Sequence, residues 1–162
     1  MVSATASTLQ VLVVDDDLGD VALVENAFAE HLVPTTLHHV FDGAEALAFL
    51  RHEEPYADAP RPDLMLLDLN MPRVDGRAVL TAVKADDDLR TIPVVVFTTS
   101  SSPEDISASY VTRANAYVTK PTNLDDFDHV LSEIRNFYGH VVSLPRRGSD
   151  ATRHDGTTPA VD

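Results

Sequence analysis

The chain has 162 residues, of which 44% are hydrophobic, and it carries a formal net charge of −14. This hydrophobic content is enough for the core of one domain, so disorder over the whole chain is excluded. The strong negative charge argues against a nucleic-acid partner, which needs clustered lysines and arginines. The chain has no cysteine, which excludes disulfide and thiolate chemistry.

No apolar run approaches the roughly 18 residues that a membrane-spanning helix needs, and the first ten residues lack the pattern of a secretory signal. We therefore expect a soluble, cytoplasmic protein with no membrane partner. Among the 12 basic residues, only Lys84 and Lys120 are lysines. An acidic, lysine-poor surface is similar to that of proteins from salt-loving organisms, which predicts a halophilic source; ordinary acidic solubility is the alternative.

Apolar runs of strand length alternate along the chain with stretches of helical period. The predicted strands are residues 10–14, 36–40, 64–67, 93–98 and 116–119. The predicted helices are residues 21–28, 44–50 and 76–85, one that begins at Ser102 and Pro103, and a last one with an apolar stripe from Leu124 to Phe137. Such apolar strands are typical of a parallel sheet with helices on both faces. We therefore predict an α/β fold, flavodoxin-like (βα)5, with strand order 2-1-3-4-5.

The predicted domain covers residues 9–144 and follows an N-terminal extension of residues 1–8. From residue 145 onward the composition changes to Pro, Arg, Gly, Ser, Asp and Thr. Residues 145–162 are therefore predicted to be a flexible tail, too short for a second domain.

In a sheet of this topology, ligands bind beyond the carboxyl ends of the strands, between the first and third strands. Acidic, hydroxyl and basic residues follow the strands there: Asp15, Asp16 and Asp17 after the first, Asp68 after the third, Thr98 and Thr99 at the fourth, and Lys120 with Pro121 after the fifth. An acidic run after a strand is usually a solvated loop or a helix cap. Together, these residues predict acids from two neighbouring strands beside a hydroxyl and a lysine.

Clustered carboxylates repel one another, and one of them holds a proton at neutral pH unless a cation intervenes. Mg²⁺ takes one or two carboxylates and leaves room for a phosphate oxygen. An aspartate carboxylate is a known nucleophile for forming an acyl phosphate. We therefore predict Mg²⁺ as the cofactor and Asp68, at the end of a central strand, as the nucleophile, with Lys120 offsetting phosphate charge.

Four motifs make the chain similar to the receiver domains of response regulators in two-component signalling (CheY-like), over about residues 9–142. The motifs are VLVVDDD at 11–17, LMLLDLNMPRVDG at 64–76, PVVVFTTS at 93–100 and AYVTKP at 116–121. The resemblance implies that Asp68 is the phosphoacceptor. It also implies that Asp15 and Asp16 organise Mg²⁺, with Asp16 as a direct ligand, and that Asn70 gives its backbone carbonyl to the metal.

The same resemblance implies a conformational switch. Thr98 matches the hydroxyl that moves to the phosphoryl group, and Tyr117 matches the aromatic residue that turns inward on activation. Lys120 matches the lysine that contacts the phosphate, and the Lys120–Pro121 peptide bond is expected to be cis, because an X–Pro bond is the one place where a cis peptide costs little. Asp17 is interpreted as the N-cap of the first helix rather than as a metal ligand.

The resemblance implies a single-domain response regulator that accepts a phosphoryl group from a sensor histidine kinase and has no DNA-binding output domain. It implies no enzyme beyond assistance to the domain's own phosphotransfer and dephosphorylation. The output would pass to a downstream protein target or a relay. The insert 51–63, the segments LLDLNMP and TTSS and the ending NFYGHVVSLP are similar to stand-alone regulators that pair with phytochrome-like and related PAS or GAF sensors. Such regulators are often homodimers; the apolar face of the last helix serves either a second copy or the core.

Three alternatives compete with this interpretation. A pseudo-receiver that never carries phosphate would not need the full set of acids, hydroxyl and lysine. A phosphohydrolase with an aspartate nucleophile often needs a second acid two residues later, where this chain has Asn70, which is a poor proton donor. A calcium loop starting at Asp15 would need glycine and glutamate where Asp20 and Asn26 stand.

Overall fold

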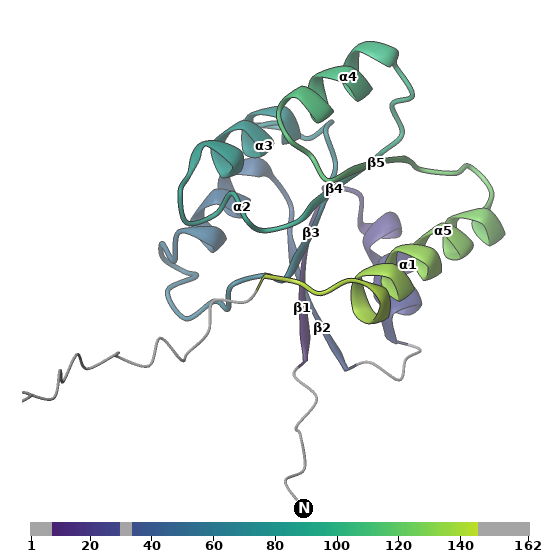
Figure 1. Ribbon diagram of the computed structural model, residues 1–162, viewed down its shortest axis with the longest axis horizontal. Helices are drawn as coiled ribbons and strands as arrows, with labels where there is room; N and C mark the ends of the chain where they lie inside the picture. The colour runs from purple at the N-terminus through teal and green to yellow at the C-terminus, as the bar shows by residue number, and fades with distance from the viewer. Residues whose placement is uncertain (1–7, 30–33, 146–162) are drawn as a thin grey trace, which may run out of the picture.

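A computed structural model describes residues 8–29 and 34–145, which form a five-stranded parallel sheet with helices on both faces (Figure 1). The strand order is β2-β1-β3-β4-β5, as the sequence predicts. The strands are β1 (Leu9–Val14), β2 (Thr35–Val40), β3 (Leu64–Leu67), β4 (Val94–Thr98) and β5 (Ala116–Thr119). Pro93 was predicted as the first residue of β4. It lacks an N–H, but its carbonyl accepts a hydrogen bond from Met65 N at 2.9 Å, so it still joins the ladder.

Five α-helices connect and follow the strands. They are α1 (Leu18–Ala29), α2 (Gly43–Leu50), α3 (Gly76–Ala85), α4 (Pro103–Val111) and α5 (Leu124–Asn136). Helices α1 and α5 cover one face of the sheet, and α2, α3 and α4 cover the other (Figure 1). The starts of α2 to α5 are fixed by the side chains of Asp42, Asp75, Ser102 and Asn123, which accept backbone N–H groups of the first turn.

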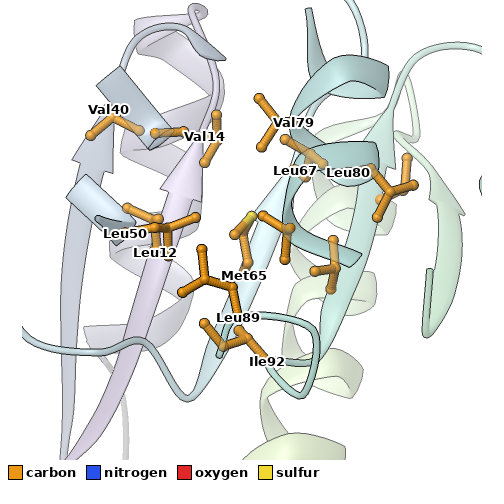
Figure 2. Close-up of a cluster of buried hydrophobic side chains, with 14 of the residues drawn as sticks. Leu12, Val14, Val40, Leu50, Met65, Leu67, Val79, Leu80, Leu89 and Ile92 are labelled. Carbon is orange, nitrogen blue, oxygen red and sulfur yellow. The ribbon is translucent and has the colours of Figure 1, made fainter. Parts of the chain in front are cut away.

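The three central strands β1, β3 and β4 are buried on both faces, which gives two hydrophobic clusters. One lies between the sheet and the helices α2 and α3, where Leu12, Met65 and Leu67 pack against Val79 and Leu80 (Figure 2). The other lies under α1 and α5 and contains the four residues that predicted the first helix: Val21, Val24, Ala27 and Phe28. This two-sided burial explains the near-continuous apolar strands of the sequence.

The apolar stripe predicted for the last helix is correct in its middle and wrong at its ends. Phe127, Leu131 and Ile134 are buried, but Leu124 is 67% exposed and Phe137 is 47% exposed. Leu124 is the first residue of α5, and Phe137 begins a π-helical turn that extends to Val141. Phe137 caps the end of α5 and does not continue the stripe, and its ring packs edge-on against Tyr138 with centroids 5.1 Å apart.

Among the described residues, the first strand begins at Leu9 and the last helical turn ends at Val141; the predicted domain of residues 9–144 stays a prediction. The predicted extension (1–8) and tail (145–162) lie outside the described residues, except for Thr8 and Pro145. Over the described ranges, no helix has both the length and the apolar composition needed to cross a membrane.

Candidate functional site

Three carboxylates meet at the carboxyl ends of the central strands. Each of Asp15, Asp16 and Asp68 offers an oxygen, and these oxygens lie within 4.8 Å of one another. Asp15 and Asp68 are buried, at 4% and 7% exposure, while Asp16 is exposed to solvent. The parallel pairing of β1 with β3 sets this arrangement, because Asp68 N donates to Val14 O at 2.9 Å and so aligns the ends of the two strands. We call these three residues the acidic site.

Lys120 supplies the cation that the acidic site requires in this structure. Its ammonium lies 2.7 Å from Asp15 Oδ2, 2.8 Å from Asp20 Oδ2 and 3.3 Å from Asp68 Oδ2. Burial alone would lower the pKa of Lys120, but hydrogen bonds to Asp15 and Asp20 and the negative charges nearby raise it above the ordinary lysine value. Lys120 is therefore protonated, and it neutralises carboxylates that would otherwise repel one another.

Burial lowers the pKa of a lysine but raises the pKa of an aspartate. The pKa of Asp15 is therefore raised, and the hydrogen bonds from Lys120 and from Asp17 N offset only part of this effect. The Asp17 contact is 2.8 Å long and holds Asp15 Oδ1, so Oδ2 is the oxygen that faces the lysine. Asp17 itself accepts Asp20 N at 3.1 Å, which confirms it as the N-cap of α1.

Asp20 is a member of this charge cluster that the sequence analysis missed. It stands three residues after the Asp17 cap, where an acid is common because it stabilises the start of a helix. Only the approach of Lys120, 100 residues away in sequence, gives Asp20 a second role. One sequence signal indicates this role of Asp20. Asp17, the N-cap, and Asp20 both lie at the start of α1, which begins at the carboxyl end of β1, where the acidic site lies.

The donor set fits a divalent cation. The three acidic-site oxygens are hard ligands that Mg²⁺ prefers, and their mutual distances of 4.8 Å or less allow one ion to reach more than one of them. Exposed Asp16 opens the group to solvent, which leaves room for the water ligands that Mg²⁺ retains. Asn70 lies two residues beyond Asp68, and its N–H donates to Asp68 Oδ1 at 3.3 Å.

Gly76 lets the backbone after Asp68 fold back tightly. A Cβ atom at this position would lie 2.0 Å from Asp68 O, a distance that no side chain can occupy. Gly76 N also donates to Leu69 O at 3.0 Å. The glycine at the start of α3 therefore helps to fix the backbone that presents the Asp68 carboxylate.

Thr98 and Tyr117 both lie beside the loop that follows β4. Thr98 is fully buried at the end of β4, and its Oγ1 is 3.5 Å from Ser100 N. The Tyr117 hydroxyl donates to Ser100 O at 2.8 Å, and its ring packs on the cluster under α2 and α3. Ser100 Oγ in turn donates to Asp105 at 2.6 Å, and Arg77 holds that carboxylate from α3 at 2.8 Å. Tyr117 is therefore tied to a hydrogen-bonded loop rather than free in solvent.

The expectation of a cis Lys120–Pro121 bond is wrong in this structure. The cis peptide within the described residues is Glu54–Pro55, and Lys120–Pro121 is trans. The trans form is the lower-energy isomer of an X–Pro bond. The Lys120 ammonium reaches the carboxylates of Asp15 and Asp68 with the bond in this form.

Comparisons with known proteins agree with this geometry. Residues 11–132 match the model of the response regulator receiver domain family. The response regulator Rcp1 of Synechocystis sp. is 42% identical over 135 residues, which cover 83% of this chain and 92% of Rcp1. The crystal structure of the phosphorylated cyanobacterial phytochrome response regulator RcpA has a TM-score of 0.85 and 42% identity, covering 86% of this chain and all of RcpA. The Mn²⁺-bound form of Rcp1 has a TM-score of 0.83 and 40% identity, covering 85% of this chain and 99% of that one.

Proposed function

Because the chain belongs to the response regulator receiver domain family, we propose that it accepts a phosphoryl group from a sensor histidine kinase on the carboxylate of Asp68. The observation that carries this proposal is the meeting of Asp15, Asp16 and Asp68 at one edge of the sheet, with Lys120 within 3.3 Å of Asp68. Asp68 ends the central strand β3 and is held by its own backbone contacts, which suits a nucleophile that must be positioned accurately.

Asp15, Asp16, Asp68 and the Asn70 carbonyl would hold a divalent cation, which we propose to be Mg²⁺. When bound, the cation supplies positive charge where the carboxylates and the phosphoryl oxygens come together. The Mn²⁺-bound structure of the relative Rcp1 supports a divalent metal in this family. Asp16 is the exposed member of the set and gives the ion access from solvent.

In the transfer step, a carboxylate oxygen of Asp68 attacks the phosphorus of a phosphohistidine. The new O–P bond forms as the N–P bond breaks, and the donor imidazole leaves with its electron pair and is protonated by solvent. Lys120 then turns from the aspartates to a phosphoryl oxygen, a short movement because its ammonium already contacts Asp68. Water later hydrolyses the acyl phosphate, so the domain assists its own phosphorylation and dephosphorylation without acting on other substrates.

The phosphoryl group brings about −1.5 to −2 charges to the end of β3. We propose that the Thr98 hydroxyl bonds one of its oxygens, that the loop carrying Ser100 shifts with it, and that the Tyr117 ring moves further inward. The hydrogen bond from the Tyr117 hydroxyl to Ser100 O couples the Tyr117 ring to the loop that follows Thr98. The surface of α4, β5 and α5 would then change and be read by a protein partner or a relay.

Two kinds of partner follow from this proposal. The likeness to RcpA, a phytochrome response regulator, supports a phytochrome-like sensor kinase as the phosphodonor. Tyr110, Val111 and Leu124 expose apolar surface on α4 and α5, and we propose that a second copy of the chain covers it. Light scattering with and without a phosphate mimic would report this homodimer, and a monomer under both conditions would contradict it.

The test of the proposed function is phosphorylation by acetyl phosphate with Mg²⁺, read by intact mass. We expect one added phosphoryl group on the parent chain, none on Asp68→Asn, and none on the parent when EDTA removes the metal. Asp63→Asn is a matched control, since Asp63 is an acid outside the site that accepts Gln10 N, and it should be phosphorylated like the parent. Phosphorylation of Asp68→Asn at the parent level would contradict the assignment, and a parent that never gains the group would favour a pseudo-receiver.

A further inference from the structure

A cleft of about 530 Å³ lies at the amino ends of strands β4 and β5, whereas the acidic site lies at the carboxyl ends of the strands. Its lining consists of basic and neutral polar residues: Lys84, Arg90, Thr91, Arg113 and Asn115. We call these five residues the basic cleft. Arg90 and Thr91 precede β4 and Asn115 precedes β5, so β4 separates the cleft from Thr98 by about 15 Å. Within the part of the chain that the structure describes, the lining holds three cations and no acid, although the whole chain has a net charge of −14.

Lys84 is held in the wall of the cleft by three neutral acceptors. Its ammonium donates to Arg90 O at 3.0 Å, to Ile92 O at 2.9 Å and to Asn115 Oδ1 at 3.2 Å. These three bonds use all three donors of the ammonium. Among the described residues, no carboxylate forms an ion pair with this ammonium. Its positive charge is therefore held in place and contributes a positive potential to the cleft.

The neutral side chains of the lining are oriented as donors. Asn115 Oδ1 accepts from both Lys84 Nζ and Val94 N, at 3.2 and 2.9 Å, which fixes the amide and leaves its NH₂ group to donate. Thr91 Oγ1 accepts from Arg61 at 3.0 Å, so its own hydrogen is also left to donate. A lining of donors selects ligands that carry acceptors.

Arg113 is placed at the cleft by an unfavourable backbone conformation. It follows α4 with φ of 74°, a left-handed conformation that usually carries glycine at the end of a helix. Its N–H donates to Tyr110 O at 2.9 Å, which closes the helix end. No ion pair to its guanidinium is found in the part of the chain that the structure describes. A long cationic side chain where glycine would be less strained points to a use for that side chain.

Arg90 completes the set of charges. Its guanidinium is 3.3 Å from Asp87, but both side chains are exposed, at 60% and 93%. Exposed ion pairs of this kind contribute little to stability. A ligand with several negative charges can therefore replace Asp87 as the partner of the Arg90 guanidinium. The cleft therefore offers two guanidinium groups, an amide and a hydroxyl as donors around a fixed ammonium.

We propose that the basic cleft binds a small oligophosphate, with the phosphate oxygens accepting from Arg113, Arg90 and Asn115. Its volume lies in the range of small-ligand pockets and exceeds what a single phosphate fills. The described residues contribute no apolar side chain to the lining on which a nucleobase would pack, so the phosphate chain itself is the recognised group. The site is separate from the phosphorylation site and does not depend on the function proposed for Asp68.

The test uses inorganic tripolyphosphate as the probe, titrated into the ¹⁵N-labelled full chain without Mg²⁺. We expect saturable shifts of the Thr91, Arg113 and Asn115 amides, with orthophosphate binding at least about tenfold more weakly because it engages fewer donors. Arg113→Gly should weaken tripolyphosphate binding about tenfold, yet fold normally, because glycine suits the left-handed conformation. Asn115→Asp keeps the acceptor for Lys84 and places a negative charge in the cleft, so it should abolish binding.

Arg51→Ala is the matched control, because it removes the same charge from an exposed residue outside the cleft and should leave the affinity within about twofold. The proposal is overturned if the shifts do not saturate, or if Arg113→Gly and Arg51→Ala weaken binding equally, which would mean attraction by net charge alone. An acidic peptide that binds as tightly as tripolyphosphate would also overturn it, since the ligand would then be a polypeptide.

Discussion

The two lysines of the chain lie at opposite ends of the strands of one sheet. One is surrounded by carboxylates and the other by neutral acceptors. Lys120 contacts three carboxylates, and their hydrogen bonds and charges raise its pKa despite burial. Lys84 contacts two carbonyls and an amide oxygen, and burial lowers its pKa. Both ammonium groups have all their hydrogen bonds, so the difference between them is charge neutralisation. The carboxyl ends of the strands are therefore suited to binding a cation, and the amino ends of β4 and β5 to binding an anion.

The largest effect is expected when each lysine is replaced by methionine. Lys120→Met leaves buried carboxylates without a counter-ion and should cost about 3 kcal/mol of unfolding free energy in EDTA. Lys84→Met leaves only neutral acceptors unpaired and should cost about 1 kcal/mol. Urea unfolding of the parent and both variants measures these values. Saturating Mg²⁺ should reduce the loss of unfolding free energy for Lys120→Met but not for Lys84→Met, because the metal replaces the lost positive charge. Equal losses for both variants would show that charge does not distinguish the two lysines.

Alkaline unfolding should separate the two lysines by the sign of their pH dependence. The folded pKa of Lys120 is raised, so its contribution is complete below the ordinary value of 10.5 and is lost only as pH rises through the folded pKa. The folded pKa of Lys84 is lowered, so the stability of the parent relative to Lys84→Met should rise with pH from that folded pKa up to 10.5. Unfolding of the parent and both variants from about pH 8 to about pH 11 checks this. Parallel curves for the two variants would contradict the account.

A smaller effect is expected at Asp20, the carboxylate that competes with Asp68 for Lys120. Asp20→Asn removes a negative charge and loosens the hold on the ammonium, which should speed phosphorylation of Asp68 by acetyl phosphate about threefold. Asp17→Asn is the matched control, because it removes the same charge while asparagine keeps the helix cap. A rate for Asp20→Asn that equals the rate for Asp17→Asn would mean that the Lys120 contact has no part in the transfer.

The sheet and the acidic site could be predicted because both depend on short stretches of sequence. Apolar strands such as residues 64–67 are recognisable by composition, and the topology brings the residues after β1 and β3 together. The bond from Asp68 N to Val14 O is the outcome of that rule. The positions of Asp15, Asp16 and Asp68 therefore followed from strand order alone.

What could not be predicted depends on contacts between distant segments. Asp20 is an ordinary first-turn acid until Lys120 reaches it, and the basic cleft needs the end of α3, the loop before β4 and the residues after α4 to meet. The apolar spacing also does not indicate that α5 ends at Asn136, before the exposed Phe137. The isomer of the Lys120–Pro121 bond was predicted wrongly, because the two forms differ by only about 1 kcal/mol and sequence alone does not decide between them.

The most direct test of the acidic site is a titration of the ¹⁵N-labelled chain with paramagnetic Mn²⁺ in place of Mg²⁺. We expect the amide signals of residues 15–17 and 68–70 to broaden together at the lowest metal concentrations. Asp16→Asn should weaken this binding at least about tenfold, and signals at the basic cleft should stay sharp. Broadening near residues 15–17 without broadening near residues 68–70 would show that the ends of β1 and β3 do not share one cation, which would rule out the acidic site as a metal site.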